Sequence, residues 1–280
     1  MIQEYDNFDW ERFFVPYRQT VKELDLKFRI LIDSYATLNE YCPIYRVLGR
    51  VKTPASILDK ASSESYAIDE LASNMQDIAG IRLITQFEGD IYVIVEMIKS
   101  RTDMNIIKTK DYLANPKQSG YKSVHLIVEY DVNSIYGFQK TLCEIQIRTL
   151  AMDFWASIEH SLNYKYNDEM PEEIKVRLIN AAESIGHIDT EMGNIKEEIK
   201  AAQKIYRKKT SVNNDIVDGL NALSRYGKKD RTKKYYKFYE QLVKDGDLLQ
   251  LSLMQKEIEE EINELMKAER EENNGTNYYN

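Results

Sequence analysis

A run of alternating side chains over residues 143–149 holds the residues best suited to chemistry in this sequence. Successive side chains of a β-strand point to opposite faces, so its two isoleucines are expected in the core. Glu144, Gln146 and Arg148 then share the other face. A carboxylate, an amide and a guanidinium together are groups that an active site uses. A solvated edge strand has the same pattern, so this run alone leaves both interpretations open.

A polar loop over residues 115–125 is the second candidate, because it carries Lys117, Tyr121, Lys122 and His125. An aromatic ring beside basic residues can stack a nucleobase while its phosphates are neutralised. Taken singly, Tyr121 is equally an anchor of the loop on the core, and His125 a hydrogen-bonded core histidine. Their occurrence together favours a nucleotide site.

The segment 77–82 is the third candidate, with Asp77 just before a predicted strand and Arg82 on it. A lone aspartate at the entrance to a strand is usually a turn residue. It also suits Mg²⁺, which takes one or two carboxylates together with phosphate oxygens. With Glu144 it supplies two acids for phosphoryl-type transfer, one for a metal and one to accept the proton of an attacking hydroxyl.

Positive charge gathers around a turn-rich segment over residues 49–54, which leads into a short helix with a proline in its first turn. Arg50, Lys52 and Lys60, with Ser56 among them, lie close to the N-terminus of that helix. The partial positive charge of a helix N-terminus favours phosphate. The sequence therefore predicts a phosphate-binding region here.

The pattern of the chain up to residue 149 predicts a mixed sheet flanked by helices, an α/β (α+β) fold. An apolar stripe from Phe14 to Leu38 indicates a long first helix, capped at its start by Asp9. Further helices are expected at 69–75 and 90–99, and strands at 81–87, 105–112, 124–132 and 142–149.

From residue 151 onward the pattern is helical, with a long helix starting at Pro171 and running towards Arg207. The stripe Leu251, Met254, Ile258, Ile262 and Leu265 is compatible with a subunit interface or with packing on its own domain. The predicted domains are a core with the long first helix, a helical C-terminal extension for oligomerisation or RNA binding, and a disordered tail. Their ranges are 1–166, 167–272 and 273–280.

The bulk composition is that of a globular protein of 280 residues, 43% hydrophobic and 30% charged, with a net charge of −8. No run approaches the 18–20 apolar residues, roughly, that span a bilayer, and the N-terminus is acidic where a secretory signal is basic. We therefore expect a cytoplasmic protein that does not bind membranes. Its two cysteines are expected to be free thiols, without structural zinc.

The net charge hides a strong segregation. Residues 204–237 contain eleven Lys/Arg and three Asp/Glu, whereas residues 240–272 contain four Lys/Arg and eleven Asp/Glu. These two segments pair with each other, form two solvated faces, or leave a basic surface that binds RNA or tRNA. The sequence leaves these alternatives open.

Four motifs in order resemble the synthetase domain of the RelA/SpoT family over about residues 10–166, and the length resembles the small alarmone synthetases. The motifs are Gly49-Arg50-Val51-Lys52 with Ser56 and Lys60; Asp77-Ile78-Ala79-Gly80-Ile81-Arg82; Asn115-Pro116-Lys117 through Gly120-Tyr121-Lys122-Ser123-Val124-His125; and Glu144-Ile145-Gln146-Ile147-Arg148-Thr149 followed by Asp153-Phe154-Trp155-Ala156.

The resemblance implies a nucleotidyltransferase-like core that transfers the pyrophosphate of ATP to the 3′-hydroxyl of GDP or GTP, giving ppGpp or pppGpp and AMP, in a homo-oligomer, with a tetramer favoured. By position, it implies that Arg50 and Arg82 flank the adenine of ATP and that Lys52, Ser56 and Lys60 hold its phosphates. Asp77 would bind Mg²⁺, and Glu144 would act as the base and help in metal binding. Tyr121 would stack on guanine, and the residues orienting the acceptor would be Lys117, Lys122, His125 and Gln146. Such a reaction depends on positioning and charge stabilisation.

The chain also departs from the family pattern. Lys122 stands where the family usually has arginine, which keeps the charge but loses the two-pronged hydrogen-bonding fork. Residues 61–63 lack the basic side chains often found there. None of the three histidines is followed by aspartate, so no hydrolase activity is expected.

Three alternatives accompany this interpretation. A toxin-type relative would move the pyrophosphate to the 3′ end of tRNA, held by the basic segment 204–237. A non-catalytic RNA-binding regulator would not need Asp77, Glu144 and Tyr121 together. A polymerase-type nucleotidyltransferase would need a Gly-Ser and an Asp-x-Asp pair that the sequence lacks. The preferred acceptor among GDP, GTP and GMP has no sequence signature.

Overall fold

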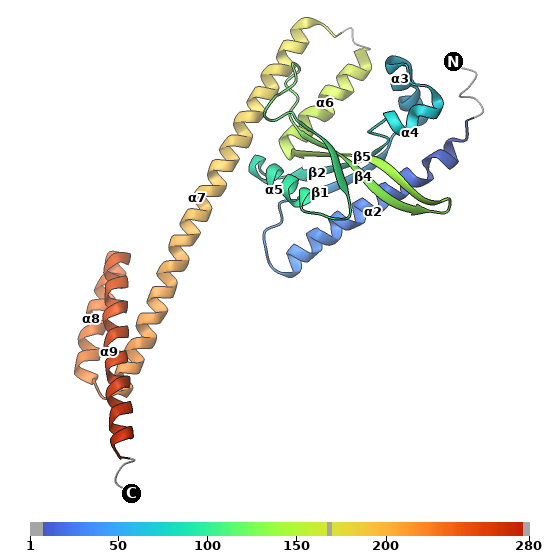
Figure 1. The fold of residues 1–280 in the computed structure, drawn as a ribbon. Helices are drawn as coiled ribbons and strands as arrows, with labels where there is room; N and C mark the ends of the chain where they lie inside the picture. The colour runs from blue at the N-terminus through green and yellow to red at the C-terminus, as the bar shows by residue number, and fades with distance from the viewer. Residues whose placement is uncertain (1–7, 167–169, 277–280) are drawn as a thin grey trace. The chain divides into compact units, whose positions relative to one another are not determined.

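The structure of this chain, a computed structural model, describes residues 8–166 and 170–276. The chain divides into two compact units, Met1–Asn194 and Ile195–Asn280, and the boundary falls within one helix. The first unit contains the β-sheet and all of the predicted site residues (Figure 1). The second unit is helical.

A mixed five-stranded sheet is the centre of the first unit, with the strand order β1-β2-β5-β4-β3. The neighbours β2 and β5 run parallel, and the other pairs are antiparallel. The predicted mixed sheet is confirmed. The strands are β1 (Arg46–Val51), β2 (Ala79–Thr85), β3 (Asn105–Asp111), β4 (Val124–Ser134) and β5 (Gly137–Thr149).

Helices flank this sheet, as the sequence predicts. Pro54 occupies the first turn of α3, and Asp9 caps α2 by accepting a hydrogen bond from the Arg12 amide at 3.0 Å. The helices are α2 (Trp10–Thr37), α3 (Pro54–Glu64), the 3-10 turn η1 (Ile68–Glu70), α4 (Leu71–Asn74), α5 (Glu88–Lys99), α6 (Leu150–Tyr166) and the first part of α7 (Glu172–Arg225).

Strand β1 is the element that the sequence analysis missed, since residues 49–54 look like a turn. Its backbone pairs with β2, with Gly49 opposite Ile81 and Arg50 opposite Gly80. A Cβ atom on Gly49 would lie 2.7 Å from Val21 Cγ1, so only glycine lets α2 pack this close to the strand. Glycine lowers the strand propensity of this segment, but pairing with β2 forms the strand in spite of it.

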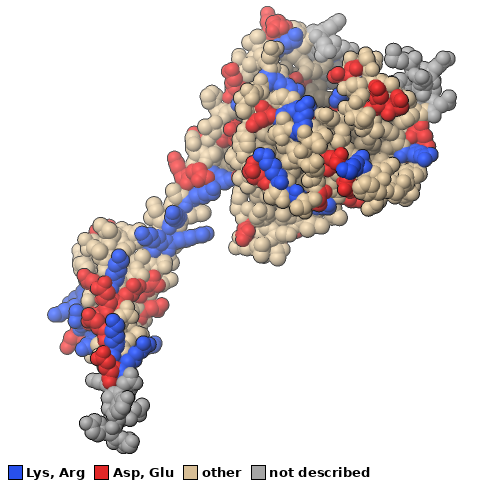
Figure 2. All heavy atoms as spheres, in the orientation of Figure 1, with Lys and Arg blue, Asp and Glu red and all other residues tan. Residues whose placement is uncertain are grey.

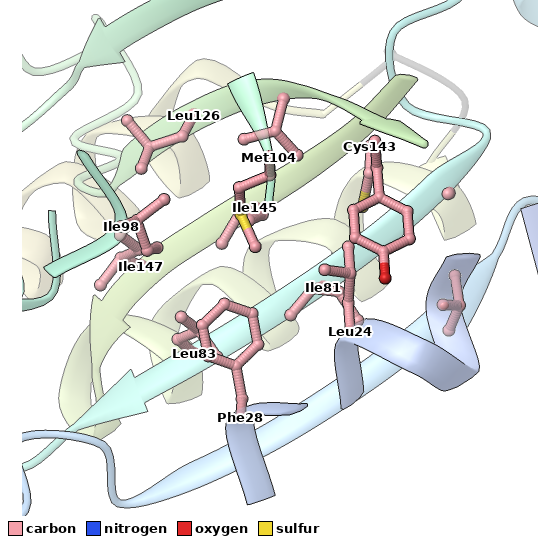
Figure 3. Close-up of a cluster of buried hydrophobic side chains, with 14 of the residues drawn as sticks. Leu24, Phe28, Ile81, Leu83, Ile98, Met104, Leu126, Cys143, Ile145 and Ile147 are labelled. Atoms are coloured by element: carbon pink, nitrogen blue, oxygen red, sulfur yellow. The ribbon is translucent and has the colours of Figure 1, made fainter. Parts of the chain in front are cut away.

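One face of the sheet carries the hydrophobic core, covered by α2 and α5. In Figure 3, Leu24 and Phe28 of α2 lie against Ile81 and Leu83 of β2, beside the isoleucines of β5. Each fully buried side chain of this size is worth about 1.5–3 kcal/mol. The alternation of β5 holds as predicted, because Cys143, Ile145 and Ile147 are buried here and the polar residues between them face the other way.

The second unit consists of the remainder of α7, α8 (Lys229–Asp245) and α9 (Leu248–Thr276), which enclose a core of their own. The stripe from Leu251 to Leu265 packs in that core, so packing on its own domain is the alternative that the structure supports. Helix α9 includes residues 273–276 of the expected tail, and residues 277–280 lie outside the described part. Within the described residues, no helix has the length and apolarity needed to cross a membrane.

Candidate active site

The sheet register places the polar residues of three strands on the face opposite the core. Arg82 of β2 lies opposite Gln146 of β5, which in turn lies opposite His125 of β4. Glu144 lies two residues before Gln146 and therefore points to the same side. Because β5 is an inner strand, the solvated-edge interpretation of this run is wrong.

Asp77 is held by two lysines at the entrance to β2. Lys52 Nζ lies 2.7 Å from Asp77 Oδ2, and Lys60 Nζ lies 2.8 Å from Asp77 Oδ1. The pairing of β1 with β2 creates this arrangement, since the Lys52 amide donates to the Ile78 carbonyl at 2.9 Å. Burial raises the pKa of Asp77, but the bonds from the two lysines outweigh burial and lower it. Asp77 is therefore a carboxylate at neutral pH.

Glu144 has a hydrogen-bond donor on each oxygen. His125 Nδ1 lies 3.0 Å from Oε1, and Gln146 Nε2 donates to Oε2 at 2.7 Å. On the other side of the imidazole, Nε2 lies 2.8 Å from the Tyr121 hydroxyl. Burial raises the pKa of Glu144, and the neighbouring Asp77 charge adds to this, but the bonds from His125 and Gln146 lower it overall. Glu144 is thus ionised and fixed in orientation.

Tyr121 lies half-buried at the edge of the site, between other side chains. Lys117 Nζ lies 5.1 Å from the centre of its ring and 5.0 Å from the ring of Tyr112. The ring packs against a small apolar cluster that includes Trp155 and Ala182. Its hydroxyl is held by the histidine, while the ring lines a cavity. Tyr121 therefore anchors the loop on the core and also lines the cavity.

Two arginines share one aspartate beside this cavity. Arg82 Nη1 and Arg148 Nη2 lie 3.1 Å and 2.6 Å from Asp153 Oδ1. The Nε atoms of both arginines are buried without a hydrogen-bond partner among the described residues. Burial and the neighbouring Arg148 charge lower the pKa of Arg82. Two guanidinium groups with spare donors favour an anionic ligand.

Two adjoining cavities collect these groups. The smaller, about 190 Å³, is lined by Asp77 and Glu144, and the larger, about 450 Å³, by Lys117, Tyr121 and His125. The two cavities share three lining residues, namely Arg50, Arg82 and Gln146. The structure therefore brings together ten of the predicted site residues, counting Lys52 and Lys60 through their contacts with Asp77.

Two predicted residues lie apart from these cavities. Ser56 is exposed near the start of α3, where its amide donates to Thr53 Oγ1 at 3.3 Å. Lys122 points at α7, since a Cβ atom on Gly186 would lie 2.8 Å from its Nζ. Neither residue lines the two cavities described above.

Further charged residues and a histidine of this region are not among the predicted site residues. Arg148 and Asp153 stand in the quoted motif, and the alternation of β5 already placed Arg148 on the site face. Glu159 and His160 of α6 line the larger cavity as well. Their position one helical turn after Ala156, on a helix that follows β5 directly, was the available signal.

The donor set fits a magnesium ion better than a metal cluster. No group of three or more His, Cys, Asp or Glu side chains able to hold a metal occurs among the residues that the structure describes. Asp77 and Glu144 are two ionised carboxylates on one small cavity. Mg²⁺ is commonly bound by one or two carboxylates plus substrate phosphates, so this pair matches its preference.

Comparisons with known proteins agree with this geometry. Residues 49–169 match the family model described as a region found in RelA / SpoT proteins. The GTP pyrophosphokinase YjbM of Bacillus subtilis (strain 168) is 47% identical over 204 residues, covering 73% of this chain and 96% of that protein.

Solved structures give the same result. The small alarmone synthetase 1 of Bacillus subtilis bound to its product pppGpp has a TM-score of 0.66 and 48% identity, covering 68% of this chain and 97% of that chain. The same protein bound to AMPCPP has a TM-score of 0.61 and 44% identity, with 68% and 97% covered.

Proposed function

Because this chain belongs to the RelA/SpoT family, we propose that it is a (p)ppGpp synthetase of the small alarmone synthetase type. The 3′-hydroxyl of GDP or GTP attacks the β-phosphorus of ATP, the bond between the α- and β-phosphates breaks, and AMP leaves. The products are ppGpp or pppGpp and AMP. Relatives named GTP pyrophosphokinase and a related structure holding pppGpp support this reaction.

The observation that carries the proposal is the hydrogen-bonded row Tyr121–His125–Glu144–Gln146 beside Asp77. Glu144 is ionised, so it can accept the proton of the 3′-hydroxyl as that oxygen bonds to phosphorus. Each of its two oxygens accepts one hydrogen bond, so the carboxylate is held in one orientation before the proton transfer.

The donor nucleotide is proposed to occupy the smaller cavity and its rim. Arg50 and Arg82 flank the adenine, and Lys52, Ser56 and Lys60 hold the phosphates. Asp77, helped by Glu144, is proposed to hold Mg²⁺, which would neutralise charge on the phosphate oxygens. The two lysines on Asp77 are then free to turn to the triphosphate, which has more negative charge than one carboxylate.

The acceptor nucleotide is proposed to occupy the larger cavity, with its guanine on the ring of Tyr121. Lys117 lies over that ring and is placed to meet the phosphates. His125 and Gln146 line the same cavity and orient the ribose. Lys122 is proposed to serve the acceptor only after turning away from α7.

An acceptor-labelling assay tests the function. ATP labelled at the γ-phosphate is incubated with the protein, Mg²⁺ and either GDP, GTP, GMP or deacylated tRNA, and the products are separated. We expect label in guanosine nucleotides, equimolar AMP, and loss of both in Glu144→Gln. Label on tRNA alone would overturn the proposal, and so would full activity of Glu144→Gln.

Three predictions about the setting of this enzyme accompany the proposal. We propose that it acts in the cytoplasm, with ATP and guanine nucleotides as its partners. Omission of Mg²⁺, with a chelator present, is expected to abolish product formation. A homo-oligomer, with a tetramer favoured, is expected, and light scattering after size-exclusion chromatography measures it directly.

A further inference from the structure

The helical unit separates its charges between helices. Residues 204–237, on α7 and α8, have eleven Lys/Arg and three Asp/Glu. Among the described residues of this stretch, one ion pair connects it to α9, between Arg231 and Glu261 at 3.2 Å. Figure 2 shows basic and acidic side chains lying side by side over the surface of this unit. The opposite charges therefore do not neutralise each other by pairing, which was the simplest explanation of the segregation.

Helix α8 presents two contrasting faces. Its inner face carries Thr232 and Leu242, which are buried in the core of the unit. Its outer face carries Lys229, Lys233 and Lys237, all exposed and four residues apart. Residues at this spacing lie on one row of a helix, with a rise of about 6 Å between them. The lysines thus form a regular row of positive charge, without an ion-pair partner among the described residues.

Two aromatic side chains are exposed on the two flanks of this row. Tyr236 and Phe238 have 38% and 50% of their surface accessible. At about 100° per residue, Tyr236 lies directly beside the lysines and Phe238 lies about 100° beyond Lys237 on the other flank. Beside a row of lysines, exposed rings provide stacking surfaces for nucleobases, whereas the lysines neutralise phosphates. Unpaired bases offer their faces for such stacking, and bases inside a duplex do not.

An anionic membrane is a poorer fit to this surface. A helix that binds a bilayer inserts a continuous apolar face between the lipids. In α8 that face is already covered, because Tyr235, Tyr239 and Leu242 pack in the core of the unit. What remains outside is mainly charged, with Tyr236, Phe238 and Val243 exposed at separate positions rather than as a continuous apolar face.

We propose that the outer face of α8 binds single-stranded nucleic acid, through Lys229, Lys233 and Lys237 on the phosphates and through Tyr236 and Phe238 on the bases. The surface belongs to the second unit, and none of these residues takes part in the proposed reaction. The relatives reported above cover 68% to 73% of this chain, so more than a quarter of it has no counterpart in them. The inference does not depend on the proposed function.

Fluorescence anisotropy tests the proposal by measuring binding of the full chain to labelled, unstructured 20-mers of RNA and DNA over a range of salt concentrations. A duplex of the same length is the comparison probe, and phosphatidylserine vesicles are added as a competitor. The test variant is Lys229→Glu/Lys233→Glu/Lys237→Glu. Its matched control is Lys256→Glu/Lys267→Glu/Arg270→Glu on α9, which makes the same change in net charge at exposed positions.

We expect at least 10-fold weaker binding for the α8 variant and less than a 3-fold change for the control. The slope of log K against log salt should fall by about 2 when three phosphate contacts are lost. Tyr236→Ala/Phe238→Ala should weaken binding with the salt slope unchanged. The affinities for the RNA and DNA 20-mers are compared to show whether the 2′-hydroxyl of the sugar contributes to binding. Circular dichroism and pyrophosphate transfer without nucleic acid should be unchanged in every variant.

Four results would overturn the proposal. The first is absence of binding by the wild-type protein at 100 mM salt, and the second is an equal loss of affinity in the α8 variant and its control. The third is equal affinity for duplex and single strands. The fourth is binding to phosphatidylserine vesicles that competes with RNA and is lost in the α8 variant. Each is distinguishable from failure of the proposed reaction, because the labelling reactions with GDP or GTP contain no nucleic acid.

Discussion

His125 Nδ1 lies 3.0 Å from Glu144 Oε1, and Nε2 of the same ring lies 2.8 Å from the Tyr121 hydroxyl. A neutral imidazole donates from one nitrogen and accepts at the other. Donation to the Glu144 carboxylate leaves Nε2 to accept from the tyrosine. One buried histidine therefore sets the position of the proposed base and of the proposed guanine shelf together.

Replacement of this histidine tests that coupling. In His125→Asn the bond that helps to lower the Glu144 pKa is lost, while burial continues to raise it. Because the base must be ionised, activity should be lost at a higher pH on the acid side than in wild type. We expect kcat to fall by about 10²-fold. The pH dependence of kcat/KM measures the shift.

Tyr121→Phe is the matched control, since it removes the hydroxyl and keeps the ring. It should leave the KM for GDP within a factor of about 3, because stacking is retained. If activity on the acid side is lost at the same pH in His125→Asn as in wild type, the histidine does not act on the base.

The two lysines on Asp77 give a prediction about stability. Lys52→Met leaves a half-buried carboxylate with one partner instead of two. The free energy of unfolding should fall by about 1–3 kcal/mol at pH 7, measured by urea denaturation. A carboxyl with a depressed pKa stabilises the fold above its unfolded pKa and loses that effect as pH falls through its folded value. The variant should therefore lose stability at a higher pH than wild type.

Lys99→Met provides the comparison, because Lys99 pairs with Glu96 at 2.7 Å on an exposed helix surface. An exposed pair of this kind contributes about 0–1 kcal/mol. If the two variants lose equal stability, the Asp77 contacts have no special energetic role.

Much of this site could be predicted, because the alternation of side chains along β5 shows which of them share a face even when the fold is unknown. The alternation assigned Glu144 and Gln146 to one face, and the motif order suggested which loops approach it. The lysine contacts with Asp77 were not predictable, since they depend on the pairing of β1 with β2, and β1 itself was hidden by Gly49. The contact of Lys122 with α7 was not predictable either, because Gly186 lies 64 residues further along the chain.

The close approach of the loop over residues 115–125 to α7 gives a third prediction. Gly120 has φ +87°, and a Cβ atom there would lie 2.6 Å from Ala182 Cβ. Gly120→Ala should therefore suffer both backbone strain and a clash that moves the neighbouring Tyr121. We expect a lower Tm and a KM for GDP raised by about 10-fold, equivalent to about 1.4 kcal/mol.

Gly137→Ala separates the two causes. Gly137 has φ +90° but open space around its Cβ position, so its variant should pay only the strain of about 1–2 kcal/mol. Its KM for GDP should be unchanged. In Gly120→Ala/Ala182→Gly the clash is relieved and the KM should recover, although the Tm should not. A KM that stays high in the double variant would contradict the steric explanation.

Asp189 of α7 gives a prediction about pH, because it is buried and its Oδ2 accepts a hydrogen bond from Thr149 Oγ1 at 2.8 Å. Burial raises the pKa of Asp189 to about 6, with a further rise from Glu88 and partial opposition from Thr149 and Lys122. The folded pKa exceeds the unfolded value of about 3.9. The buried charge therefore costs stability above pH 6, and this cost declines as pH falls from about 6 to 4.

Asp189→Asn keeps an acceptor for Thr149 and removes the charge. We expect it to be more stable than wild type at pH 7.5 by at least about 1 kcal/mol, seen as a Tm increase of about 2–4 °C. The difference should shrink towards pH 4. Thr149→Val should do the opposite, since it leaves the carboxylate without its donor and so lowers stability at pH 7.5. If Asp189→Asn is the less stable protein at pH 7.5, attraction to Lys122 outweighs burial, and this carboxylate holds the loop to α7 as an ion.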